Sequence, residues 1–555
     1  MKPIRNTRLL AAALTVVCLL AATFAADAAG RGKAILTGVV YGDGAPLAGV
    51  HVSDGVHFAT TDAAGRYRLE SDKSAGFVFA VTPSNWVAAE ADGIQPLFWA
   101  ALDERSDRDE QHDFRFASVD QSRYTMLFFT DLHLTNSSEK HDLDHYRSIA
   151  LSSISDEAAQ ASARGPVYSL NLGDLSHDLY WYQYDFDVAS AKRFLERNGF
   201  PTLLYSLPGN HDHDAATQAG EGVDRRAEHL YRRTFGPTYY AMNIGDVHWI
   251  MMDNIIYRNT PGKGKKNVGV VGARDYDRGF TPAQLEWLRR DLATVDASKR
   301  VCLCTHCPIF FDRDRWTLLS DPAQIDSLDA IFSRFDKVQL FSGHAHRILH
   351  SGNPRYPRFE QYVLPATSGE MWTTNDHFQA LCVDGSDAGF VVARIDGDRF
   401  DYTYRTEAYG RKKLRAYDMN GVGAYYRSCD LIGVQQRLYP ERVDYGRPEY
   451  ANCVYVNYWE YQPGQRVEMY EAGRALRVEQ VEDEDPLYNI SHYLPALAEK
   501  PVYKKGDARV ISHHMFAAKA RTATDPVEIR IVGADGKVLH SETLERPKPF
   551  DKEAR

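Results

Sequence analysis

The hydrophobic and polar positions of the chain change their pattern twice, which divides it into three regions. Residues 33–116 show short runs of alternating β-formers separated by Asp/Gly turns, a pattern typical of a small β-sandwich. Residues 122–405 alternate apolar strand-like runs with helical patterns, which favours a layered α/β domain. After about residue 411 the pattern becomes mainly β again and is rich in Tyr and Val. We therefore predict small all-β domains on both sides of an α/β domain.

Two local patterns refine the α/β region. Thr281-Pro282-Ala283-Gln284 opens an apolar-periodic run, with Thr as N-cap, Pro in the first turn and Gln completing a capping box. We therefore predict a helix that begins at this point. The stretch from Ile255 to Arg278 is rich in Gly and Lys, and we interpret it as a mobile surface loop.

The first residues have the pattern of a secretory signal peptide. Lys2, Arg5 and Arg8 precede the apolar run Leu9–Ala22, and small residues follow as far as residue 29. An uncleaved membrane anchor is the rival interpretation, but the run is short for a membrane span. Lipidation at Cys18 is a minor alternative, because Val17 precedes it where a small residue is expected. We expect a periplasmic or secreted mature chain with no membrane span.

The domain prediction then has four parts: a signal peptide (1–29), a β-sandwich (30–118), an α/β domain (119–408) and a C-terminal β-rich domain (409–555). With 44% hydrophobic and 25% charged residues, the 555-residue chain has the composition of a globular protein. Its formal net charge of -10 argues against general nucleic-acid binding, which needs a basic surface.

Five short polar motifs each follow a predicted strand of the α/β region. They are Asp131-Leu132-His133, Gly173-Asp174-Leu175-Ser176-His177-Asp178, Gly209-Asn210-His211-Asp212, Thr305-His306-Cys307-Pro308 and Gly343-His344-Ala345-His346. Ligands bind beyond the carboxyl ends of strands in open α/β sheets. Carboxylate, imidazole and amide groups suit divalent first-row metals, whereas burying so many polar groups without partners is costly. The motifs together predict a metal site.

In this order and at these separations, the motifs resemble those of the calcineurin-like metallophosphoesterases. The resemblance covers the whole α/β segment, about half of the chain, and the β-rich ends resemble a bacterial exported three-domain subgroup. It implies a four-layer fold, in which two facing mixed sheets are flanked by helices and a dinuclear site lies at the sheet edges. The N-terminal region contains Gly44-Ala45-Pro46-Leu47-Ala48-Gly49-Val50 and Thr60-Thr61-Asp62-Ala63-Ala64-Gly65-Arg66-Tyr67. With this pattern it resembles a carboxypeptidase-regulatory-like, transthyretin-type sandwich.

The resemblance also implies the site residues. Two divalent ions would be held, with Asp174 bridging them, by Asp131, His133 and His346 on one side and by Asn210, His306 and His344 on the other. His211 resembles the family's non-ligand histidine, which assists the leaving oxygen. Asp178 and Asp212 are expected to be outer partners that orient the metal ligands. Mixed N/O ligands suit Mn, Fe, Zn, Co or Ni and leave the metal open.

A thiolate zinc site at Cys302, Cys304 and Cys307 is the weaker interpretation of that cysteine-rich strand. Small buried residues or disulfide partners fit it better, and export would permit disulfides whose pairing the sequence does not assign.

The expected function is hydrolysis of a phosphate mono- or diester by metal-activated water, without a covalent intermediate. One alternative is a non-catalytic scaffold that binds the cell envelope through its β domains. A carbohydrate-active hydrolase is another, but it would need a paired-carboxylate site that we cannot identify. Trp372 and the run Tyr180–Tyr182 are open between two roles, lining the substrate cleft or packing beneath it.

Overall fold

The computed structural model describes residues 33–91, 93–104, 107–137, 142–262, 267–311, 318–372, 380–406, 412–499 and 510–551. The predicted signal peptide, residues 1–29, lies outside them. The chain divides into two compact units. The first ends at Ser118, and the second continues from Val119 to the C-terminus and also includes the short segments 83–86 and 90–96. Each unit is described by itself. Among the residues described, no helix is both long and apolar enough to span a membrane.

The N-terminal unit is the predicted β-sandwich. One sheet is built on β1 (Ala34–Gly42), which pairs with β5 (Arg66–Ser71) and β12 (Phe114–Ser118). The second has the order β10-β6-β3-β4: Trp99–Ala101, Phe77–Ala80, His51–Ser53 and Phe58–Thr60. Alternate residues of β1 and β5 are buried, as expected for strands with one face on a core. The prediction of an all-β N-terminal domain is confirmed.

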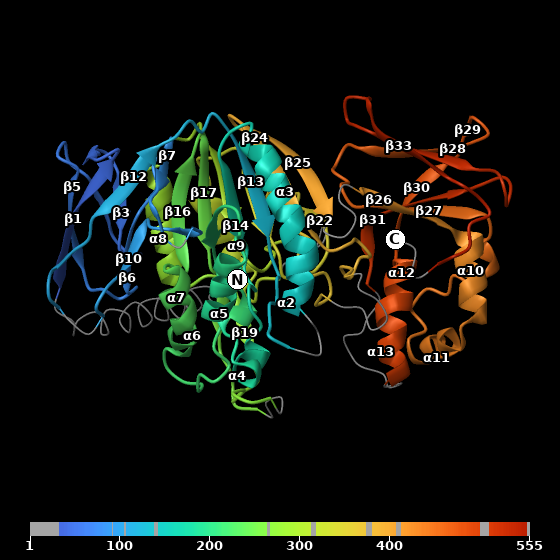
Figure 1. Ribbon diagram of the computed structural model, residues 1–555, viewed down its shortest axis with the longest axis horizontal. Coiled ribbons are helices and arrows are strands. Elements are labelled where there is room, and N and C mark those ends of the chain that lie inside the picture. Colours follow the sequence, from blue (N-terminus) through green and yellow to red (C-terminus); the bar gives the residue numbers. More distant parts are fainter. Residues whose placement is uncertain are drawn as a thin grey trace, which may run out of the picture. The chain divides into compact units, whose positions relative to one another are not determined.

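The larger unit contains the predicted α/β domain, which is built on two mixed sheets (Figure 1). The first has the order β15-β14-β13-β24-β25: Leu203–Ser206, Val167–Asn171, Arg123–Phe129, Gly389–Asp396 and Arg399–Thr406. The second has the order β16-β17-β20-β21-β23-β22: Tyr239–Ile244, Val247–Met252, Arg300–Cys304, Val338–Ser342, Phe359–Val363 and Leu349–Ser351. Neighbours among β13, β14 and β15, and among β17, β20, β21 and β23, run parallel, so their carboxyl ends share an edge.

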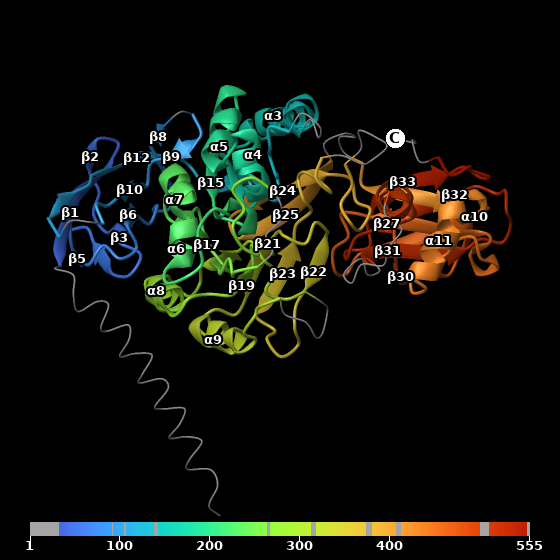
Figure 2. The ribbon, with the colours of Figure 1, turned by 90° about the horizontal axis from the view of Figure 1, so that it is seen from below.

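Aromatic side chains fill the space between the two sheets. Phe128 of β13 stacks on Phe341 of β21 with ring centroids 4.6 Å apart, and it also contacts Trp249 of β17. Helices α3 (Leu151–Ser162) and α5 (Val188–Arg197) cover the outer face of the first sheet. Helices α8 (Pro282–Ala293) and α9 (Ala323–Ile331) lie on the opposite side, as Figure 2 shows. The predicted four-layer arrangement is confirmed.

Helix α8 begins where its capping sequence predicts. The Thr281 hydroxyl accepts the N–H of Gln284 at 3.3 Å, and the Gln284 side chain accepts the N–H of Thr281 at 2.7 Å. Pro282 stands in the first turn, where a missing N–H costs nothing.

The interpretation of residues 255–278 as a mobile loop is wrong for the described residues. Strands β18 (Ile255–Tyr257) and β19 (Tyr276–Arg278) pair antiparallel, and Tyr257 is buried. The Asn259 side chain donates to the carbonyl of Thr217 at 2.7 Å, which fixes the strand end. The Gly and Lys content of the sequence did not indicate these contacts. Residues 263–266 lie outside the described part.

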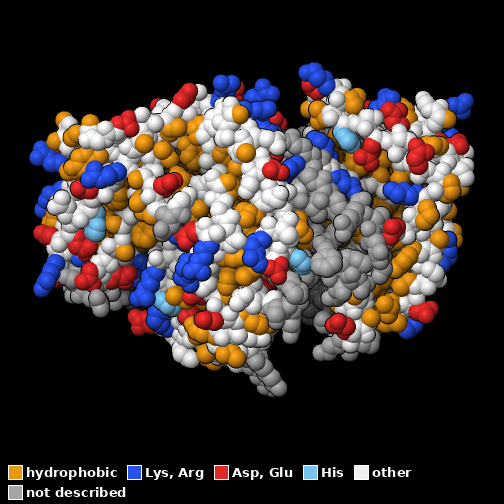
Figure 3. Space-filling view, in the orientation of Figure 1, with side chains coloured by type: hydrophobic (Ala, Val, Ile, Leu, Met, Phe, Trp, Pro, Cys, Tyr) orange, Lys and Arg blue, Asp and Glu red, His pale blue; other side chains and the backbone are white. Residues whose placement is uncertain are grey.

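The C-terminal region contains the predicted sheets and also helices. Its sheets have the orders β26-β27-β31-β30 (Leu414–Asp418, Cys453–Tyr458, Ser512–Lys519, Val478–Asp483) and β29-β28-β32-β33 (Arg474–Ala475, Arg466–Glu471, Val527–Val532, Val538–Leu544). The sequence pattern did not reveal α10 (Met419–Ser428) and α11 (Asp430–Leu438). On the face shown in Figure 3, basic and acidic side chains are interspersed over the described surface.

We expect Arg415→Ala to destabilise this unit by about 3–5 kcal/mol, because it removes one partner of a buried ion pair. Arg415 and Asp387 are 6% and 1% exposed, and the guanidinium binds the carboxylate and donates to the carbonyl of Gly385 at 2.7 Å. Urea unfolding measures the effect. Arg466→Ala is the control, since its ion pair with Glu468 is partly exposed and worth about 0–1 kcal/mol. Equal losses in the two variants would contradict the prediction.

Candidate metal centre

The seven predicted ligands meet at the carboxyl edge of the two sheets. Each follows a strand: Asp131 and His133 follow β13, Asp174 follows β14, Asn210 follows β15, His306 follows β20, and His344 and His346 follow β21. All except His344 and His346 are buried, and those two are partly buried. Their side chains form two groups with Asp174 between them.

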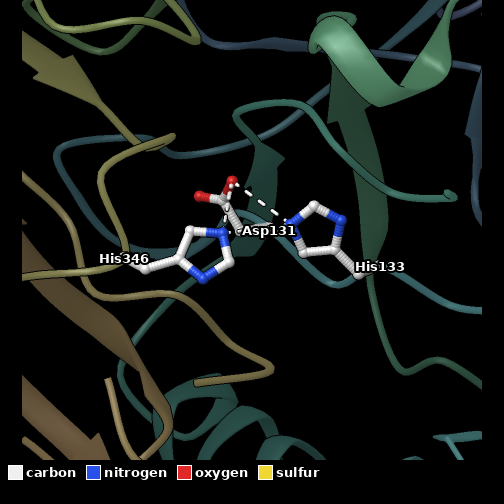
Figure 4. A group of neighbouring side chains, drawn as sticks. All are labelled: Asp131, His133 and His346. Carbon is white, nitrogen blue, oxygen red and sulfur yellow. Dashed lines mark hydrogen bonds and ion pairs between the residues drawn. The ribbon is translucent and has the colours of Figure 1, made fainter. Parts of the chain in front are cut away.

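The first group consists of Asp131, His133 and His346 (Figure 4). The Nε2 atoms of the two histidines are 3.1 Å apart. Asp131 Oδ1 lies 3.7 Å from His133 Nε2 and 3.4 Å from His346 Nε2. Three ligand atoms from two strand ends therefore face one point.

The second group forms around His306. Its Nε2 lies 3.1 Å from Asp174 Oδ2, 3.1 Å from Asn210 Oδ1 and 3.2 Å from His344 Nδ1. Asp174 Oδ2 also lies 3.9 Å from His133 Nε2 in the first group. This one carboxylate oxygen therefore stands between the two groups.

Several of the other polar atoms of these side chains have hydrogen-bond partners of their own. Asp131 Oδ2 accepts from the Thr130 hydroxyl at 2.7 Å and from the N–H of His344 at 2.8 Å, while Oδ1 has no hydrogen-bond partner. His306 and His346 each present Nδ1 to a backbone carbonyl at 2.8 Å. The Nδ1–H groups donate there, so the Nε2 atoms carry lone pairs toward the two groups.

Facing acceptors at these distances fit a metal ion. Ligand bonds of about 2.0–2.2 Å place neighbouring donor atoms about 3–3.5 Å apart, close to most of the separations observed here. Lone pairs and carboxylates without intervening hydrogens repel unless a cation lies between them. The residues present therefore fit a pair of divalent cations.

The pKa values of these side chains without a metal ion also indicate a site that attracts positive charge. Burial lowers the pKa of His306, but the carboxylate of Asp174 outweighs it and raises that pKa to about 9. Burial opposes protonation of His346 as well, yet Asp131 raises its pKa to about 9. At His344, burial and then the charge of His306 lower the pKa to about 3. Without metal, protons supply the positive charge that the carboxylates demand.

Five of the seven candidate ligands have left-handed backbone. The φ angles are 53° at Asp131, 47° at His133, 53° at Asp174, 66° at His344 and 48° at His346. Non-glycine residues adopt this region rarely and at a cost, and such residues concentrate at functional sites. The strand ends therefore turn sharply, which brings these side chains together in the two groups.

Three family models match the chain in succession. Residues 34–119 match the N terminal of calcineurin-like phosphoesterase, residues 124–347 match calcineurin-like phosphoesterase, and residues 361–538 match the C terminal of calcineurin-like phosphoesterase. The chain belongs to the calcineurin-like phosphoesterases. The predicted resemblance to the three-domain members of this family is confirmed, and the chain is a phosphoester hydrolase by family.

Solved structures similar to this calcineurin-like phosphoesterase include a dimetal phosphatase from Danio rerio (13% identity, TM-score 0.33, covering 51% of this chain and 96% of that one). GAP50, the anchor in the inner membrane complex of Plasmodium, has 11% identity and a TM-score of 0.30, covering 52% and 86%. A putative 5'-nucleotidase from Staphylococcus aureus has 12% identity and a TM-score of 0.29, covering 51% and 53%. Comparison with curated proteins gave no match.

The structure places His211 beside the metal groups and reveals a partner that the sequence did not. The N–H of His211 donates to Asp174 Oδ1 at 2.7 Å, and its Nδ1 lies 2.7 Å from Asp178 Oδ1. Arg274 donates from Nε to Asp178 Oδ2 at 2.6 Å, and its Nη2 also contacts Asp178 Oδ1. Arg274 Nη2 and His211 Nδ1 are 2.9 Å apart, which we read as two donors converging on one carboxylate oxygen.

Arg274 and Asp178 thus hold the imidazole of His211 in one orientation. Burial would raise the pKa of Asp178, but its contacts with His211 and Arg274 lower it below the usual value, so Asp178 stays ionised. Arg274 lies in the hairpin of β18 and β19. In the sequence, its only signal is a charged residue within a Gly-rich stretch. Nothing there indicates which side chain it meets.

Asp212 does not belong to either group of candidate ligands, but its hydrogen bonds connect the loops of the second and third motifs. It is 0% exposed and accepts the N–H groups of Leu175, Ser176 and Gly209 at 3.0–3.2 Å. Burial, and then the charge of Asp174, raises its pKa to about 6. Its contacts are those of a residue that positions Asp174 and Asn210.

The two open aromatic positions are resolved largely in favour of packing. Trp372 is 2% exposed, donates from Nε1 to the carbonyl of Leu132 at 2.6 Å and packs against Tyr146. Trp181 is buried and donates to Ser176 Oγ at 3.0 Å. Tyr182 is 46% exposed and binds Asp214 through its hydroxyl. Neither tryptophan offers a free face to a substrate.

The cysteine-rich strand shows no zinc site. Cys302, Cys304 and Cys307 are buried free thiols, and no cluster of potential ligands in the described part of the chain includes a cysteine.

We expect Arg274→Met to lower kcat by about 10–100-fold with the metal content unchanged, because it removes an outer contact that orients the His211–Asp178 pair. Steady-state kinetics and elemental analysis of the purified chain measure both quantities. Arg258→Met is the matched control in the same hairpin, since Arg258 pairs with Asp277 at a half-exposed site. An unchanged kcat in Arg274→Met would contradict the positioning role.

Proposed function

We propose that this chain is an exported dinuclear-metal phosphoesterase that hydrolyses a phosphate mono- or diester by metal-activated water, without a covalent intermediate. The observation that carries the proposal is the position of Asp174 Oδ2, which lies 3.1 Å from His306 Nε2 and 3.9 Å from His133 Nε2. A carboxylate shared in this way suits a bridge between two ions.

The distances in the two groups support the proposed ligands. Asp131, His133 and His346 would hold one ion, Asn210, His306 and His344 the other, and Asp174 both. When bound, two divalent ions supply the positive charge that holds phosphate oxygens and lowers the pKa of a water molecule to near neutral. The metal is Mn, Fe, Zn, Co or Ni, since imidazole and carboxylate ligands accept each of them.

His211 is the proposed catalytic group for the departing oxygen. Its Nδ1 is held by Asp178 at 2.7 Å, which leaves Nε2 free to donate a proton or stabilise negative charge on the leaving oxygen. Because Asp178 and Arg274 fix the ring, the donor is already oriented before the substrate binds. No protein nucleophile is needed in this scheme.

The deciding experiment is a panel of aryl phosphate monoesters and diesters, assayed with Mn²⁺ and with metal analysis of the purified chain. Turnover by the wild type and none by Asp174→Asn supports the proposal. No turnover of any ester by metal-loaded wild-type protein would favour the alternative, a non-catalytic envelope-binding scaffold.

The location and the domain limits are part of the proposal. Residues 1–29 supply the signal-peptide pattern, from which we propose a periplasmic or secreted mature chain. We assign residues 30–118, 119–408 and 409–555 to the three domains. N-terminal sequencing of the exported protein tests the first boundary, and a mature N-terminus at Met1 would refute it.

A further inference from the structure

A second buried cluster of ionisable groups lies outside the dinuclear site. It contains His213 (0% exposed), Glu228 (8%) and the partly buried Asp224, and Asp253 (2%) contacts Glu228. One ligand atom from each of His213, Asp224 and Glu228 lies within 4.8 Å of the others. Asp224 and Glu228 are four residues apart at helix α6 (Val223–Ala227), and therefore lie on one helical face.

The imidazole of His213 is aimed into this cluster with nothing to bind. Its Nδ1 lies 2.9 Å from the carbonyl oxygen of Gly209, so the Nδ1–H donates there and Nε2 carries the lone pair. Nε2 is buried and has no hydrogen-bond partner. The ring stacks on Tyr257 with centroids 5.2 Å apart and 17° between the planes, which fixes its direction.

Burial and mutual repulsion also disfavour the ionised carboxylates of the cluster, and the charge of Arg258 offsets this only in part at Asp224. Burial, and then the charge of Glu228, raises the pKa of Asp224 well above its usual value. Burial, Glu228 and Asp224 do the same to Asp253, which contacts the Glu228 side chain. Oδ1 of Asp224 accepts the N–H of Tyr257 at 2.5 Å, which leaves Oδ2 as the possible ligand atom. A buried lone pair facing crowded carboxylates is costly unless a cation joins them.

We propose that His213, Asp224 and Glu228 bind a third divalent cation, of the Zn²⁺ or Mn²⁺ class, separate from the dinuclear centre. One neutral imidazole with carboxylates is a ligand set that these ions accept, and Asp253 acts as the outer partner of Glu228. The carbonyl that orients His213 belongs to Gly209, which directly precedes Asn210. The ion therefore stabilises the loop that carries Asn210 and His211.

The test counts zinc per chain by elemental mass spectrometry, after the full-length protein is dialysed against Zn²⁺ and desalted. We expect three ions in the wild type and one fewer in both Glu228→Gln and His213→Ala. Asp291→Asn is the matched control, since Asp291 is also a 1% exposed carboxylate bound to a histidine, His248 Nε2 at 2.8 Å, and it should keep the wild-type count.

A wild-type count of two overturns the proposal, and so does a Glu228→Gln count equal to that of the wild type. The Tm of Glu228→Gln in Zn²⁺ is a second readout, because its change differs between a cluster that binds an ion and a cluster that does not. Loss of an ion ligand lowers the Tm, whereas neutralising one of several repelling carboxylates in an ion-free cluster raises it or leaves it unchanged. Asp174→Asn separates this proposal from the dinuclear one, because it should remove the other two ions and spare the third.

Discussion

Asp174→Asn is expected to lose both ions of the dinuclear centre and to lower kcat/KM by about 10³-fold or more. Asp174 Oδ2 lies near both groups, and an amide in its place supplies no charge to either ion. Metal ions contribute several kcal/mol of transition-state stabilisation, and each 1.36 kcal/mol is tenfold in rate. Elemental analysis and steady-state kinetics on an aryl phosphate measure the two losses.

The fold should survive this change, because the other carboxylate oxygen of Asp174 accepts the N–H of His211 and an amide oxygen can accept it as well. Far-ultraviolet circular dichroism checks this point. Asp291→Asn, remote from the centre in the described structure, serves again as the control and should keep its activity. Full metal content together with full activity in Asp174→Asn would refute the bridging role.

The second large effect is expected from Gly343→Ala. A Cβ at this position would lie 1.8 Å from Thr130 Oγ1 and 2.6 Å from Asp131 Oδ2. Thr130 and Asp131 are both 0% exposed and have no free space to move into. We expect a loss of about 1–3 kcal/mol of stability from overpacking. Activity should fall about 10²-fold, because a ligand displaced by about 1 Å no longer holds its ion in position.

Urea unfolding, metal analysis and kinetics on Gly343→Ala give the three readouts. Gly433→Ala in helix α11 is the control, since the nearest atom to its added Cβ is Arg437 Nη1 at 3.7 Å. Alanine there should be neutral or slightly stabilising, as expected in a helix. A Gly343→Ala protein with wild-type metal content and activity would show that the loop can adjust, contrary to the prediction.

The sequence was sufficient to predict which polar residues meet at the strand ends, because its signals are local. Each motif consists of a strand-like run and a polar tip within about ten residues, and parallel strands bring such tips to one edge. Gly173, Gly209 and Gly343 added to the signal. In the structure each packs against a proposed ligand or against another motif glycine, so that no Cβ fits.

What the sequence could not show depends on contacts between distant residues. Arg274 meets Asp178, which lies 96 residues away, and no local pattern contains that pairing. His213 followed the Gly-Asn-His-Asp motif without standing out, since its partners Asp224 and Glu228 come from a separate helix. Helix α10 was missed because Gly421 and Gly423 interrupt its apolar pattern, although both lie against backbone carbonyls where a side chain would clash.

The hairpin of β18 and β19 has an evolutionary consequence. The proposed ligands lie at the ends of strands in the two main sheets, whereas Arg274 lies in the connection of a separate two-stranded hairpin, and connections vary more in sequence than the strands of a sheet. Mutation of this hairpin would then change the orientation of His211, the proposed proton donor, while the proposed metal ligands stay constant. Relatives that differ in leaving-group preference would then differ in the sequence of this hairpin rather than in the five motifs of the family.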